Sequence, residues 1–292
     1  MTQTSAPGFL PSRDGFAFTN SWPPAPAVEV PTPFGSIGIG NASKGLCGGM
    51  VFAALDFWHA GIAVPVSQPD PGSPLYRFMV RRLIRSWQLP AGVAAYYRWM
   101  NRPDGDASVS LMRRRLVTQR GVSWRTICVQ WPQIKASLDD GVPAALGLVT
   151  VASANPAELG RNHQVLAVGY SLAGSAVTVR VYDPNSGQDD DARIWFDNSG
   201  PAEATALSHN LNLRYPVRGF FLTTYSPVTP PASPAAPLAS AAPLASAAPA
   251  TREGRRGHPC RNRKRSREEG TKDSLHAARA QDYIAGDRPL SI

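Results

Sequence analysis

The sequence predicts an α+β domain in which helices come first and an antiparallel sheet follows. Up to Asp140 the apolar residues mostly recur with helical spacing, whereas from Ala144 onward they form short runs of strand type separated by turn residues. Helices and strands are thus segregated along the chain, while a parallel sheet would need them to alternate. We therefore expect an N-terminal helical part packed on a C-terminal antiparallel sheet.

The part of the chain that folds is expected to be shorter than its 292 residues. Seven of the 28 prolines fall in 227–250, where the hexapeptide APLASA occurs twice in tandem. Such a segment buries too little apolar surface to offset the entropy of ordering it. We predict an extended Pro-rich arm over 1–30, one domain over 31–226, a disordered Ala/Pro-rich linker over 227–250 and a basic, disordered tail over 251–292.

Five helices are predicted in the first half. The run Met50–Ala60 is apolar almost all round, which is typical of a helix buried on most sides. Ser73 and Pro74 supply the N-cap and first-turn proline of the next helix, whose polar side carries arginines four residues apart. The other helices are predicted over 93–100, 108–118 and 132–140.

Five strands are predicted in the second half. The segment 164–170 (QVLAVGY) is apolar on both faces, which indicates a central strand. A turn at 172–175 joins it to 176–182, in which valines alternate with polar residues. The other strands are predicted over 144–151, 192–196 and 219–224.

Cys47 is the first candidate for chemistry, because it lies where a Gly-rich segment meets the predicted buried helix. A thiol at a helix N-terminus is near unpaired N–H groups, which favour the thiolate. The alternative is a small buried cysteine that only fills space. The three cysteines (Cys47, Cys128 and Cys260) suit neither a disulfide framework nor a paired zinc motif.

A base for this thiol is predicted at His163, at the mouth of the most buried strand. The other histidines lie in the tail, in a polar segment or, as His59, about 18 Å from Cys47 by helical rise. A three-residue loop at 172–174 would place Asp183 directly opposite His163 across the hairpin. A carboxylate there would orient the imidazole and stabilise its charged form. The alternative for Asp183 is a turn-initiating residue before proline.

This order of residues resembles that of papain-like cysteine peptidases: Cys at a helix start, His at a strand start, and Asp or Asn one hairpin further. It is most similar to the bacteriocin-processing (double-glycine) peptidases and their bacterial relatives. The resemblance covers about 35–226 and rests on four segments, namely 45–50 (GLCGGM), 134–151, 162–170 (NHQVLAVGY) and 181–185 (VYDPN).

The resemblance implies a papain-like fold and a cysteine hydrolase, acting on a peptide or amide through an acyl-thioester. It implies Cys47, His163 and Asp183 as the catalytic triad, with Asn185 as the alternative third member. In such families a glutamine about six residues before the cysteine donates to the oxyanion, and Asn41 occupies that position here. The backbone N–H of Cys47 would be the second donor.

Two other functions share these residues. The same fold could be a binding module without catalysis, or the cysteine could transfer its acyl group to an acceptor other than water. No cofactor or metal is expected, and the basic tail could contact acidic partners. Without a signal peptide or a membrane-spanning run, the protein is expected to be cytoplasmic.

Overall fold

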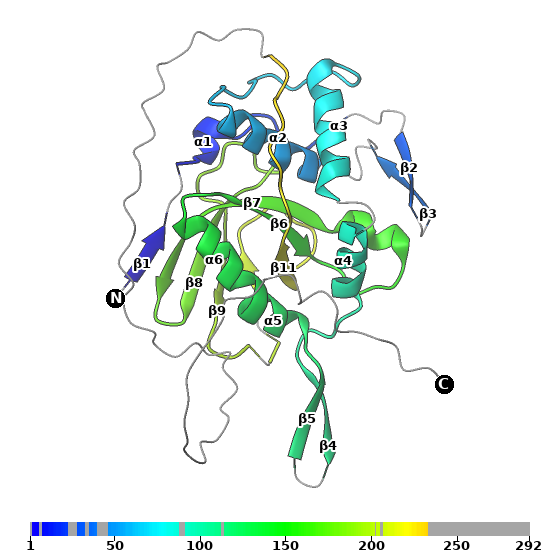
Figure 1. Ribbon diagram of the computed structural model, residues 1–292, viewed down its shortest axis with the longest axis vertical. Coiled ribbons are helices and arrows are strands. Elements are labelled where there is room, and N and C mark those ends of the chain that lie inside the picture. Colours follow the sequence, from blue (N-terminus) through cyan, green and yellow to red (C-terminus); the bar gives the residue numbers. More distant parts are fainter. Residues whose placement is uncertain are drawn as a thin grey trace, which may run out of the picture. The chain divides into compact units, whose positions relative to one another are not determined.

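The computed structural model describes residues 2–5, 8–22, 28–32, 35–39, 46–87, 91–111, 114–201, 203–204 and 207–232. The candidate Asn41, the basic tail and most of the predicted Ala/Pro-rich linker lie outside these residues. The described part mixes helices with antiparallel sheet, which confirms the predicted α+β class (Figure 1).

The main sheet has seven strands in the order β10–β9–β8–β7–β6–β11, and β1 pairs with the far half of β7. All of these pairings are antiparallel. The strands are β1 (Thr2–Ser5), β6 (Ala144–Val149), β7 (His163–Ala173), β8 (Ala176–Tyr182), β9 (Arg193–Asp197), β10 (Ser208–His209) and β11 (Gly219–Leu222). Two separate hairpins join β2 (Val28–Thr32) to β3 (Gly35–Ile39) and β4 (Ala107–Leu111) to β5 (Arg114–Gln119).

β7 is the central strand, as its apolar sequence predicts, and it separates two hydrophobic cores. Leu166 and Val168 belong to the core that contains α2 and α3, whereas Val165 and Ala167 belong to the core that contains α6. The helical elements are α1 (Pro11–Asp14), α2 (Cys47–His59), α3 (Pro74–Ser86), α4 (Ala91–Met100), α5 (Val122–Arg125), the π-helical turn η2 (Thr126–Gln130), α6 (Trp131–Asp139) and the 3-10 turn η3 (Pro156–Arg161).

Helix α2 is buried along almost its whole length, as predicted, and it packs closely on α3. At Gly49 the backbone of α3 comes so near that an added Cβ would collide with the carbonyl oxygen of Met79. Ser73 caps α3 by accepting a hydrogen bond from Tyr76 N, which confirms the predicted start of that helix. The close α2–α3 contact fixes the helix that begins at Cys47.

The N-terminal arm contributes to the core although its sequence is rich in proline. Phe9, Phe16, Phe18 and Trp22 are all buried in the core that contains α2. Phe16 packs edge-on against Phe57 of α2, with ring centroids 6.0 Å apart. Residues 8–22 are therefore packed against the domain predicted over 31–226.

Two local predictions are wrong. The segment 108–118 forms most of the β4–β5 hairpin instead of a helix, because its alternation of serine with Val109 and Leu111 has the period of a strand. The three-residue loop predicted at 172–174 is also wrong, because β7 continues to Ala173, which pairs with Ala176. Cys128 is disulfide-bonded. Cys47, in contrast, is a free thiol.

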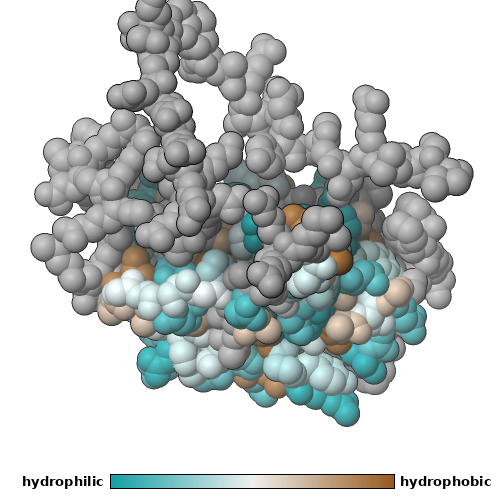
Figure 2. Space-filling view, turned by 90° about the horizontal axis from the view of Figure 1, so that it is seen from below, coloured by the Kyte–Doolittle hydropathy of each residue, from teal (hydrophilic) through white to brown (hydrophobic). Residues whose placement is uncertain are grey.

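Within the described ranges no helix is both long and apolar enough to cross a membrane. Figure 2 shows one face of the molecule, on which hydrophobic residues are scattered among hydrophilic ones. The β4–β5 hairpin exposes three apolar side chains, those of Val109, Leu116 and Val117.

Candidate active site

Cys47 is the first residue of α2, and its side chain is partly exposed. No side chain caps this helix end, so the N–H groups of the first turn are left to other acceptors. The backbone N–H groups of Gly48 and Gln164 hydrogen-bond to the Cys47 sulfur. The thiol therefore lies in a setting that favours its negative form.

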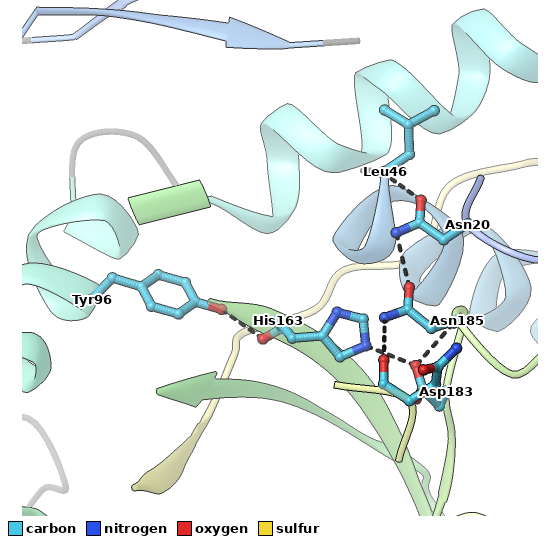
Figure 3. Close-up of polar contacts among 7 residues, drawn as sticks. Asn20, Leu46, Tyr96, His163, Asp183 and Asn185 are labelled. Carbon is cyan, nitrogen blue, oxygen red and sulfur yellow. Dashed lines mark hydrogen bonds and ion pairs between the residues drawn. The ribbon is translucent and has the colours of Figure 1, made fainter. Parts of the chain in front are cut away.

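His163 begins β7 and contacts both other members of the predicted triad. Its Nε2 lies 2.7 Å from Oδ1 of Asp183, and the two side chains are buried (Figure 3). A second side-chain hydrogen bond joins the His163 ring to Cys47. Since Nε2 faces Asp183, Nδ1 is the nitrogen left for the sulfur. The structure thus brings Cys47, His163 and Asp183 together.

Asp183 reaches His163 by a different register from the predicted one. Tyr182 pairs with Leu166, so Asp183, next along the chain, lies opposite Val165 and not His163. His163 is the diagonal neighbour on the same face, a separation that long side chains can span. The predicted contact is present, but the predicted direct opposition is wrong.

A β-bulge at Val168 is the reason that Asp183 and His163 lie on the same face of the sheet. The β7–β8 register shifts between Ala167 and Gly169, which leaves Val168 as the extra residue. Without the bulge, Asp183 would lie opposite Leu166, whose side chain points to the other side of the sheet. The bulge therefore puts the carboxylate on the side of the imidazole.

The charges of this group reinforce one another. Burial by itself raises the pKa of the Cys47 thiol. The charge and hydrogen bond of His163, together with the N–H groups of Gln164 and Gly48, outweigh burial and lower this pKa below its ordinary value. Burial lowers the pKa of His163, but Asp183 and then Cys47 raise it to about 10. Near neutral pH the geometry therefore favours a thiolate beside an imidazolium.

Asn185 lies behind Asp183. Its backbone N–H donates to Asp183 Oδ1 over 2.9 Å, and its side chain bonds to Asn20 and to the carbonyl of Asn212. Asp183, the preferred third member, is the residue that contacts the His163 ring. Asn185 instead supports the carboxylate.

Sequence reasoning missed two side chains that surround the site. Tyr96 of α4 donates a hydrogen bond to the carbonyl oxygen of His163 over 3.2 Å, and its ring hydroxyl also bonds to Gln164. Gln164 packs on the first turn of α2 so tightly that a Cβ on Gly48 would collide with it. The sequence does mark Gln164, because it is the one polar residue between His163 and the apolar part of β7.

Among the residues that the structure describes, no group of histidine, cysteine and acidic side chains could bind a metal ion. Comparisons of the chain with models of protein families, with curated proteins and with solved structures find no match.

Proposed function

We propose that this protein is a thiol-dependent hydrolase, a peptidase or amidase, in which Cys47 is the nucleophile. One observation carries the proposal: a partly exposed thiol at a helix N-terminus shares a buried histidine with a buried carboxylate. A nucleophile, a base and a group that orients the base are the parts that acyl transfer requires.

The proposed reaction begins when the Cys47 thiolate attacks the carbonyl carbon of an amide. The backbone N–H of Cys47, at the start of α2, would stabilise the oxyanion. Protonated His163 then gives its proton to the leaving amine as the C–N bond breaks, and a thioester remains. Neutral His163 next takes a proton from water, whose oxygen displaces the sulfur and releases the acid, so that thiolate and imidazolium are restored.

The resemblance to papain-like cysteine peptidases supports the same proposal. In both, the cysteine begins a buried helix, the histidine begins a strand, and the acidic residue follows one hairpin later. The four segments also resemble the double-glycine peptidases, and by that resemblance Asn41 would be the second oxyanion donor.

Labelling with a peptidyl epoxide, an electrophile selective for activated thiols, tests the proposal. We expect wild type to react, Cys47→Ala to lose labelling and His163→Ala to lose about 10²-fold or more in rate. His59→Ala is the matched control, because this exposed histidine ends the same helix. Equal labelling of wild type and Cys47→Ala would refute the assignment. Peptide amides that release a fluorescent amine then test for hydrolysis itself, which should also depend on Cys47.

A further inference from the structure

Asn20 is held in place by its neighbours in the N-terminal arm. Phe18 and Trp22, two residues away on either side, are both buried. Their rings pack edge-on with centroids 5.9 Å apart, and Trp22 packs in the same way on Tyr76 of α3 at 5.1 Å. Asn20 therefore occupies a defined position although it belongs to no helix or strand.

The Asn20 side chain uses both ends of its amide. Oδ1 accepts a hydrogen bond from the backbone N–H of Leu46 over 2.6 Å, and Nδ2 donates to Asn185 Oδ1 over 3.2 Å (Figure 3). Its backbone N–H also donates to the carbonyl of Pro184 over 2.8 Å. Leu46 directly precedes Cys47, whereas Pro184 and Asn185 directly follow Asp183.

These contacts make Asn20 a bridge between the two halves of the site. The sulfur comes from the start of α2, and the carboxylate comes from the end of β8, more than a hundred residues later. Asn185 continues the bridge to the carboxylate, because its N–H donates to the same Asp183 oxygen that contacts His163. The hydrogen bonds thus run without a gap from Leu46 to the imidazole.

We propose that Asn20 is a positioning residue that fixes the start of α2 relative to the Asp183 loop, and so sets the distance between the Cys47 sulfur and His163. The inference rests on the proposed function, since it concerns the thiolate–imidazolium pair. Asn20 touches neither the sulfur nor the ring, so it acts through Leu46 and Asn185. Removing it should weaken the pair, because misplacement by about 1 Å can cost as much as 10²-fold in rate.

The test is the rate of iodoacetamide alkylation of Cys47 as a function of pH in the full-length chain, with Tm measured in parallel. In Asn20→Ala we expect the apparent pKa of the thiol to rise and alkylation at neutral pH to slow by about 10-fold or more. Asn20→Asp keeps the acceptor for Leu46 but loses the donor to Asn185, and should be intermediate.

Asn210→Ala is the matched control. That asparagine also uses both amide ends, accepting from Arg193 N and donating to the carbonyl of Asp191, but it contacts β9 and not the Cys47 helix. It should leave the alkylation profile unchanged even if it lowers Tm.

The two failures are distinguishable. If wild-type Cys47 alkylates with the profile of an ordinary thiol, the proposed function is wrong. If wild type has a low apparent pKa and Asn20→Ala keeps it while Tm falls as in Asn210→Ala, then Asn20 is merely structural and the positioning role is overturned. A double-mutant cycle with Asn185→Ala adds a check, since a real bridge requires the two effects to be non-additive.

Discussion

At the scale of single residues, three side chains determine the chemistry, and each controls the charge of another. His163 lies between two anionic partners, so either one stabilises its proton against the cost of burial. Asp183 is the permanent partner, because it is fully buried and receives hydrogen bonds from both His163 and Asn185 N. The thiolate is therefore maintained by a carboxylate that it does not touch.

Replacing Asp183 tests this coupling. In Asp183→Ala the pKa of His163 should fall from about 10 toward its ordinary value, since the larger of its two favourable charges is lost. The apparent pKa of Cys47 should rise in consequence. Nuclear magnetic resonance titration of the His163 ring protons measures the first effect. The raised pKa of His163 stabilises the folded protein fully below pH about 6.5, and this stabilisation is lost as the pH rises through the pKa of His163 in the folded state. Asp183→Ala should therefore lose least stability at high pH. A His163 titration unchanged in the variant would contradict the coupling.

At the scale of elements, the site depends on two local features, the bulge in β7 and the glycines of α2. The hairpin spacing was enough to predict that Asp183 approaches His163, because both lie near the open end of the same pair of strands. The predicted register is wrong because β7 extends to Ala173, which pairs with Ala176, so the turn lies at 174–175 and not at 172–174. The bulge at Val168, which has no sequence signal, shifts the register by one residue. The helix predicted over 108–118 is also wrong. Three consecutive arginines, Arg113–Arg115, obscure the alternation of polar and apolar residues that is typical of a hairpin.

Gly49→Ala tests the packing that places Cys47. Helix propensity alone favours alanine in a helix interior by about 0.8–1 kcal/mol, but the added Cβ meets the backbone oxygen of Met79, which cannot rotate away. Overpacking of this kind costs about 1–3 kcal/mol, so we expect a net loss in the free energy of unfolding by urea, together with slower alkylation of Cys47.

Gly8→Ala is the control for this change, because a Cβ there meets nothing within 4 Å. A Gly49→Ala protein as stable as wild type, or more stable, would show that the α2–α3 contact is looser than described.

At the scale of the whole molecule, hydrogen bonds hold the segment after β11 against α2 and α3. Arg82 of α3 contacts Asp56 of α2 through Nε, at 2.6 Å, and through a second guanidinium nitrogen. Tyr225 and the backbone N–H of Val228 donate to the same carboxylate, and Ser226 O accepts from Arg82. Helices α2 and α3 and the segment after β11 thus converge on one buried ion pair.

Arg82→Met should destabilise the protein by about 3–5 kcal/mol, because it leaves Asp56 buried without its cation. Burial already raises the pKa of Asp56 despite its hydrogen bonds, and the variant should raise it further. The loss should therefore shrink as pH falls and Asp56 takes up a proton. Arg81→Met is the control, since Arg81 is exposed on the same helix and should change stability by less than about 0.5 kcal/mol. Equal effects of the two substitutions in urea unfolding would contradict a structural role for the pair.

The sequence allows the α+β class, the buried Cys47 helix, the central strand and the three titratable residues to be predicted, because each follows from local periodicity or spacing. Arg77, Arg81 and Arg85 are exposed, as their four-residue spacing indicates. Arg82, Tyr96 and Asn20 were not predictable, because their partners lie far along the chain and nothing in their own segments marks them. The N-terminal arm shows this most clearly. Its prolines indicate an extended segment, yet four of its aromatic residues are buried in the core.

The most direct test of the account is the pH dependence of thiolate absorbance in the ultraviolet, taken as the difference between wild type and Cys47→Ser. A thiolate stabilised by His163 should persist well below the ordinary thiol pKa of about 8.5, and His163→Ala should return it toward that value. A difference spectrum that develops only above pH about 8.5, unchanged by His163→Ala, would contradict the thiolate–imidazolium pair and with it the proposed hydrolase.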